Sequence, residues 1–138
     1  MARRSALLTT LFEDTVVVTS AEILALFSTP IELIAAPGAN KYLILEFIEA
    51  FNDHGGTDYA NVDATGVDVL YNGGVTAGNL TQGWAQASAD QLATPLAHAS
   101  QESIPVNTAI DIQALVANPT LGDGDWRIHL TWRVVEFA

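Results

Sequence analysis

Residues 125–134 read DWRIHLTWRV, and this stretch decides the class of fold that the sequence predicts. Two classes of side chain alternate strictly along it. The apolar class contains Trp126, Ile128, Leu130, Trp132 and Val134, and the polar class contains Arg127, His129, Thr131 and Arg133. Because successive side chains of a β-strand point to opposite faces, this period predicts a half-buried strand.

Residues 106–116 alternate in the same way just upstream. One class contains Val106, Thr108, Ile110, Ile112, Ala114 and Val116, and the other contains Asn107, Asp111 and Gln113. Residues 118–125, NPTLGDGD, separate the two stretches and favour turns. We therefore expect two antiparallel strands. As neighbours they would place Asp111 and Gln113 opposite the arginines of the last strand.

Residues 41–51, KYLILEFIEAF, predict a strand that is apolar on both faces apart from Glu46 and Glu49. Such a strand lies centrally in a sandwich or is covered by a partner chain. Shorter strands are expected over residues 15–18, 31–34 and 67–71. The last of these is closed by the turn residues Asn72, Gly73 and Gly74.

Helix is expected in two short places. Thr19 and Glu22 have the spacing of a capping box, in which a hydroxyl caps the first turn and a carboxylate bonds back to it. This helix would run through Phe27 and stop before Pro30, whose ring restricts the preceding residue. Residues 83–92 have some helical character as well.

These elements predict an all-β fold, an antiparallel β-sandwich or jelly roll with one or two short helices. The 138 residues suit one domain. We expect the sandwich to cover residues 15–138 and residues 1–14 to form an extended N-terminal arm. A signal peptide is not expected, because polar residues interrupt the apolar stretch that follows Arg3 and Arg4.

The composition excludes several classes of protein. With 49% hydrophobic residues the chain can form a core, so it is not a disordered protein. A net charge of −11 argues against binding to nucleic acid, and no apolar run is long enough to predict a membrane span. The absence of Cys excludes disulfides, thiolate zinc sites and a cysteine nucleophile.

Catalytic chemistry is not indicated by the sequence. The three histidines, His54, His98 and His129, lie in no recognisable nucleophile motif. A solvated position on the last strand explains His129 better than a pairing with Asp111 does. We therefore expect a protein that is not an enzyme and that needs no cofactor.

Two loops are candidates for calcium, because carboxylates and glycines occur together in them. The first contains Asp53, Asp58 and Asp63, and the second contains Asp123 and Asp125. Neither has the ligand spacing of an EF-hand loop, and exposed turns prefer the same residues. The sequence leaves this question open, and we expect no metal site.

The tryptophans divide into two groups. Trp126 and Trp132 share the apolar face of the last strand, so they are expected in the core. Trp84 lies in a polar stretch and would be either a platform for a sugar or an anchor between chains. The doubly apolar strand over residues 41–51 favours the anchor, because Trp is enriched at the centres of interfaces.

Two stretches resemble small structural proteins encoded in the virion modules of tailed bacteriophages. Residues 19–38, TSAEILALFSTPIELIAAPG, resemble their opening, in which a short helix and a strand lead to a Pro-Gly turn and a long hydrophobic strand. Residues 122–135, GDGDWRIHLTWRVV, resemble their ending, which has an aromatic-Arg-Val pattern. The middle of the chain carries no such likeness.

The resemblance implies a capsid cement (decoration) protein that binds the major capsid protein on the outside of the virion, after assembly in the host cytoplasm. It implies a homo-oligomer, with a trimer favoured. The alternatives are a virion protein of the tail, neck or fibre and a carbohydrate-binding β-sandwich. The residues expected at the interface are Arg3, Arg4, Leu7, Leu8, Phe12, Tyr42 and Trp84.

Overall fold

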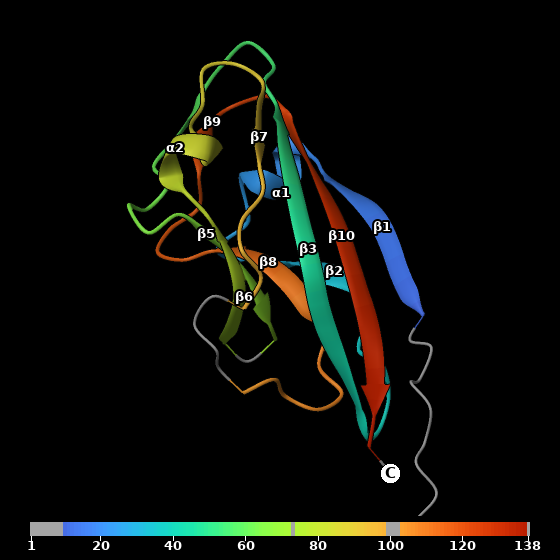
Figure 1. Ribbon diagram of the computed structural model, residues 1–138. Helices are drawn as coiled ribbons and strands as arrows, with labels where there is room; N and C mark the ends of the chain where they lie inside the picture. Colours follow the sequence, from blue (N-terminus) through green and yellow to red (C-terminus); the bar gives the residue numbers. More distant parts are fainter. Residues whose placement is uncertain (1–9, 73, 99–102, 138) are drawn as a thin grey trace, which may run out of the picture.

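Two four-stranded antiparallel sheets pack against each other in the computed structural model, which describes residues 10–72, 74–98 and 103–137 (Figure 1). The long sheet has the order β1 (Leu11–Val18), β10 (Asp125–Glu136), β3 (Lys41–Asp53) and β7 (Gln91–Ala93). The short sheet has the order β2 (Ile31–Ile34), β8 (Ile110–Ala114), β5 (Val67–Tyr71) and β6 (Val75–Leu80). A small third sheet pairs β4 (Tyr59–Ala60) with β9 (Thr120–Leu121). This architecture confirms the all-β, antiparallel class.

The strands β8 and β10 are not neighbours, so the condition under which Asp111 and Gln113 would face the arginines is not met. The strand β8 lies between β2 and β5, whereas β10 lies between β1 and β3 in the other sheet. Asp111 therefore faces Glu32 and Leu70, and the arginines pair with Asp53 and Glu46 of β3 instead. Only a tight hairpin turn forces two consecutive strands to be adjacent. The connection between β8 and β10 is long enough to cross from one sheet to the other.

A β-bulge in β3 interrupts its alternation, so both alternating classes of its sequence contain core-facing residues. Trp132 lies opposite Leu45 and Thr131 opposite Phe47, so Glu46 is the extra residue. The core-facing residues are consequently Leu43 and Leu45 before the bulge and Ile48, Ala50 and Asn52 after it. The expected central position is confirmed, since β3 lies between β10 and β7.

Both helices are shorter than the sequence indicates. The capping box is present at α1 (Ser20–Ile23), but the helix ends at Ile23 instead of Phe27. The helical pattern is lost after Leu24, because the N–H groups of Ala25 and Leu26 bond to carbonyl oxygens three residues back. The N–H groups of Phe27 and Ser28 then donate to the side-chain oxygen of Asn118, so the helix does not continue to Phe27. The second helix, α2 (Gln82–Ala85), covers only the start of the expected stretch, and residues 91–93 form strand β7. Within the described residues, no helix is both long and apolar enough to cross a membrane.

The first strand begins earlier than expected. Leu11 already pairs with Arg133, and the ladder continues to Val18 opposite Trp126. The expected boundary after residue 14 therefore falls inside β1. Residues 1–9 of the expected arm lie outside the described residues.

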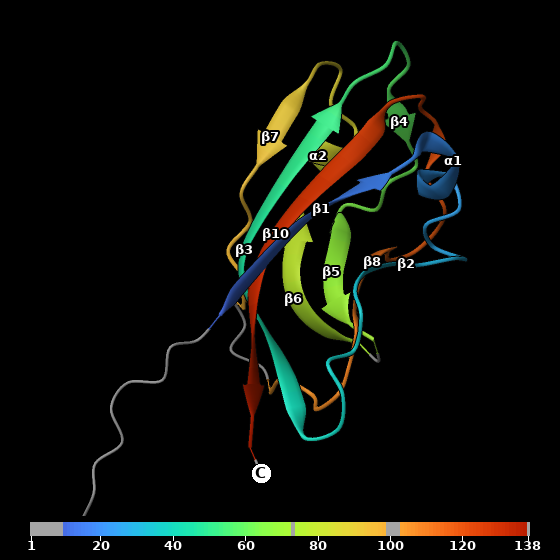
Figure 2. The ribbon, with the colours of Figure 1, turned by 90° about the vertical axis from the view of Figure 1, so that its right-hand side faces the viewer.

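The long sheet extends beyond the short one. Its two central strands have 13 and 12 residues, whereas the strands of the short sheet have between 4 and 6. At about 3.3 Å per residue, β3 spans about 43 Å against about 20 Å for β6. Figure 2 shows the consequence: the start of β3 and the end of β10 project past the short sheet. We call this part the overhang.

Candidate interaction surface

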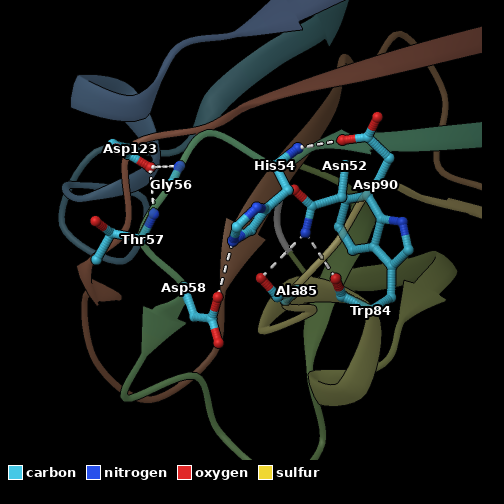
Figure 3. A network of polar contacts seen from close by, with 9 residues as sticks. All are labelled: Asn52, His54, Gly56, Thr57, Asp58, Trp84, Ala85, Asp90 and Asp123. Atoms are coloured by element: carbon cyan, nitrogen blue, oxygen red, sulfur yellow. Dashed lines mark hydrogen bonds and ion pairs between the residues drawn. The ribbon is translucent and has the colours of Figure 1, made fainter.

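A network of polar contacts ties the loops together at the end of the molecule opposite the overhang (Figure 3). Asp123 accepts hydrogen bonds from the backbone N–H groups of Gly56 and Thr57, at 2.8 and 2.9 Å. His54 Nε2 lies 2.8 Å from Asp58 Oδ1, and the backbone N–H of His54 donates to Asp90 at 3.0 Å. The Asp123 contacts join the β3–β4 loop to the loop before β10, and the Asp90 contact joins it to the residues before β7.

The other two histidines lie elsewhere and have partners of their own. His129 is hydrogen-bonded to Thr15 Oγ1 at 2.7 Å and lies 3.6 Å from a carboxylate oxygen of Glu13. His98 stacks on Tyr71 with ring centroids 5.9 Å apart, and burial lowers the pKa of His98. The structure therefore does not gather the histidines into one site.

The two loops considered for calcium do meet, but backbone N–H groups bind the carboxylate that joins them. The hydrogen bonds from Gly56 and Thr57 hold the pKa of Asp123 below its usual value. Asp63 accepts hydrogen bonds from Thr65, and Asp53 pairs with Arg127. Over residues 10–72, 74–98 and 103–137, no three His, Asp or Glu side chains are placed to share a metal ion.

Trp84 is buried, so the expectation that it anchors a contact between chains is wrong. Its side chain is 3% exposed, and its ring lies against Trp126 with centroids 4.9 Å apart. The indole N–H donates to the carbonyl oxygens of Ala50 at 3.0 Å and Gln91 at 3.1 Å. The buried position removes Trp84 as a sugar platform too. The sequence does carry a signal for this position. Thr81 is the N-cap of α2, and the turn that it caps directs Trp84 inward.

The remaining residues expected at an interface have different positions. Arg3, Arg4, Leu7 and Leu8 lie outside the described residues. Phe12 is 44% exposed and stacks on Trp132, with ring centroids 5.9 Å apart. Tyr42 is half-buried and packs edge-on against Phe137. Phe12 and Tyr42 thus both lie at the overhang.

An apolar groove of about 450 Å³ lies under the overhang, and we call it the overhang groove. Two segments form it. The long sheet contributes Phe12, Leu43, Trp132 and Val134, and the segment that begins at the end of β2 contributes Ile34 and Pro37. The groove exists because the short sheet ends before the long one, which leaves core-facing side chains covered only by this segment.

Lys41 lies at the overhang groove and differs from the other cations of the fold. Arg127 pairs with Asp53 at 2.9 Å and Arg133 pairs with Glu46 at 2.5 Å. Among the Lys and Arg residues that the structure describes, Lys41 alone forms no ion pair. The only sequence signal for this site is a lone lysine beside an apolar strand.

The outward face of the long sheet is a second exposed surface. Val17, Arg127, Phe51 and Leu92 form one row across its four strands. Phe47 and Leu92 are 65% and 61% exposed. This face thus combines exposed apolar side chains with the described arginines, a mixture typical of protein contacts.

The outward face of the short sheet is acidic by contrast. Its four strands contain no Lys or Arg. Glu32 lies directly opposite Asp111, and burial together with the charge of Glu32 raises the pKa of Asp111. Like charges directly opposite each other destabilise a sheet.

Replacing Asp111 by Asn should stabilise the fold at neutral pH. A raised pKa means that ionisation of Asp111 costs the folded state free energy above pH 4, so the gain should be present at pH 7 and vanish below pH 4. We expect about 0.5 kcal/mol, because the pair is partly exposed. Urea unfolding at both pH values measures it. Glu32→Gln should give a smaller gain, because it removes the repulsion and leaves the Asp111 carboxylate partly buried, and adding it to Asp111→Asn should change little. A loss of stability at pH 7 would contradict the argument.

Comparisons with known proteins give one informative likeness. A chain of the structure titled "Cyanophage Pam1 capsid asymmetric unit" aligns with 96% of this chain, and 93% of that chain is covered, with a TM-score of 0.57. The two sequences are 18% identical, so the likeness shows a shared fold. The sequence matches no family model, and no curated protein matches it.

Proposed function

We propose that this chain is a bacteriophage capsid cement (decoration) protein. It binds the outside of the shell formed by the major capsid protein and stabilises that shell through protein–protein contacts, with no catalysis. The observation that carries the proposal is the likeness to a capsid chain. Because 96% of this chain and 93% of the other are covered, the likeness extends over nearly the full length of both chains.

The side chains of the fold support a structural role. The histidines and loop aspartates that acid–base or metal chemistry would use are engaged in contacts that hold the fold together. The outward face of the long sheet offers a planar area of roughly 600 Å² at usual strand spacings. That area approaches the roughly 800 Å² per partner of a stable interface.

The acidic surface supports a role in many copies on one particle. A net charge of −11 on 138 residues would keep particles that carry many copies soluble and separate from one another. We propose a homotrimer as the binding unit. Sedimentation equilibrium of the purified protein should then give three times the chain mass of 14.7 kDa. A monomer would contradict the trimer and leave the cement role standing.

Cosedimentation tests the cement role. Purified protein is mixed with expanded, undecorated shells of the major capsid protein from the phage that encodes the chain, and bound protein is quantified after centrifugation. We expect saturable binding at a fixed ratio to the shell subunit and a higher temperature of shell disruption. No binding at micromolar concentration would refute the cement role, and binding to purified tails instead would support the tail alternative.

A further inference from the structure

The overhang groove has the composition of a binding site for an apolar segment. Phe12 and Trp132 stack at one side of it, and Phe12 remains 44% exposed although it faces the core side of the sheet. The volume of about 450 Å³ suits a few aliphatic side chains. An apolar groove left open to solvent in a protein with a complete core indicates contact with another chain.

The charge of Lys41 indicates that the segment bound in the overhang groove carries a negative charge. The sequence has 16 acidic residues against 5 basic ones, and both arginines described by the structure have acidic partners. An ammonium group without an ion pair beside an apolar groove is complementary to a carboxylate carried by an incoming segment. The binding segment should therefore contain Asp or Glu next to its apolar residues.

The open edge of β1 adds hydrogen-bonding groups. The strand β1 is the outermost strand of the long sheet, and its far side has no partner strand within residues 10–72, 74–98 and 103–137. The N–H of Thr15 donates to the side chain of Asp14 at 2.8 Å, so this N–H points away from β10. By the alternation of antiparallel ladders, the N–H of Glu13 points the same way, beside Phe12.

We propose that the overhang groove binds an extended segment of the shell subunit, a proposal that rests on the cement role. The segment pairs with the open edge of β1 as a fifth strand, in the manner of β-strand addition. Alternate side chains of the bound segment then face the side of the sheet on which Phe12 and Trp132 lie, and these are its apolar side chains. Because Lys41 lies on β3, two strands in from β1, the segment continues past the edge of β1 and across the overhang groove, where one of its carboxylates pairs with Lys41.

Charge reversal at Lys41 tests the ion pair in the cosedimentation assay. Lys41→Glu should weaken shell binding at least tenfold, because it replaces attraction by repulsion, whereas Lys41→Arg should bind like the wild type. Ser88→Glu adds an acidic charge to an exposed loop outside the groove and should also bind like the wild type. Equal binding by Lys41→Glu and the wild type would overturn the groove proposal while the cement role stands. If wild-type protein does not bind shells, the cement role itself fails.

Proline at position 13 tests strand addition. Glu13→Pro removes the N–H at the open edge without breaking the ladder to β10, and edge strands tolerate proline. Glu13→Thr removes the same carboxylate and keeps the N–H. We expect at least tenfold weaker shell binding for the proline variant alone, with equal thermal transitions for both variants. Equal binding by the two would overturn strand addition. A shift in self-association instead of shell binding, seen by sedimentation velocity, would identify a second copy as the occupant and overturn the proposal.

Discussion

Trp84→Ala should lower the free energy of unfolding by about 3–5 kcal/mol, the usual cost of removing a buried aromatic side chain. Trp84 is almost fully buried against Trp126, so the substitution leaves a cavity in the core. It also removes the donor to the carbonyl oxygens of Ala50 and Gln91, which link β3 to β7. Urea unfolding followed by far-UV circular dichroism measures the effect without relying on the missing fluorophore.

Trp84→Phe is the matched control for this prediction. The phenyl ring keeps most of the packing and loses both hydrogen bonds, so the expected loss is smaller, about 1–3 kcal/mol. The result that would contradict the structure is a Trp84→Ala variant with wild-type stability and weakened association. That result would mean that Trp84 lies on the surface, which is the position that the polar residues around it predict from the sequence alone.

The sequence predicted the elements whose signals are local. Strict alternation defined β10, because a strand with one buried face needs only its own side chains to show it. Thr19 and Glu22 defined the start of α1, since both partners of a capping box lie within one turn. The absence of helix up to Phe27 was not predictable, because Asn118, which binds the backbone N–H groups there, lies 90 residues away from Ser28.

Features that depend on distant partners were missed. The bulge at Glu46 changes which residues of β3 face the core, and it is visible only in the register with Thr131 and Trp132. The sequence left open whether β8 and β10 are neighbours, because a turn-rich connection between two sheets resembles a loop between neighbouring strands. Trp84 was misplaced since the polar stretch around it is a turn that directs one large side chain inward.

The candidate site was only partly predictable. Phe12 was expected at an interface and does line the overhang groove, whereas Trp84 does not. The groove joins segments that are far apart in the sequence, around Phe12, Ile34 and Trp132. Each of these residues has the pattern of an ordinary core position. These residues line a surface groove because the two sheets differ in length, and the sequence of a single strand does not show that difference.

The second large effect is expected at Gly66, which precedes β5. Its φ of +89° lies in a region that L-residues avoid, at a cost of about 1–2 kcal/mol. A Cβ at this position would meet the backbone carbonyl of Leu80 at 2.0 Å. Leu80 lies opposite Val67 in the β5–β6 ladder, so the clash cannot be relieved without shifting that pairing.

Gly66→Ala should therefore lower the free energy of unfolding by about 3 kcal/mol or more, as expected for backbone strain combined with overpacking. Gly83→Ala is the matched control, because a Cβ there meets nothing within 4 Å and the residue lies in α2. That substitution should be neutral or stabilise by up to about 1 kcal/mol, since alanine loses less backbone entropy in a helix. Parallel urea unfolding of the two variants measures the difference. Equal stabilities would show that the approach of Gly66 to Leu80 does not constrain the short sheet.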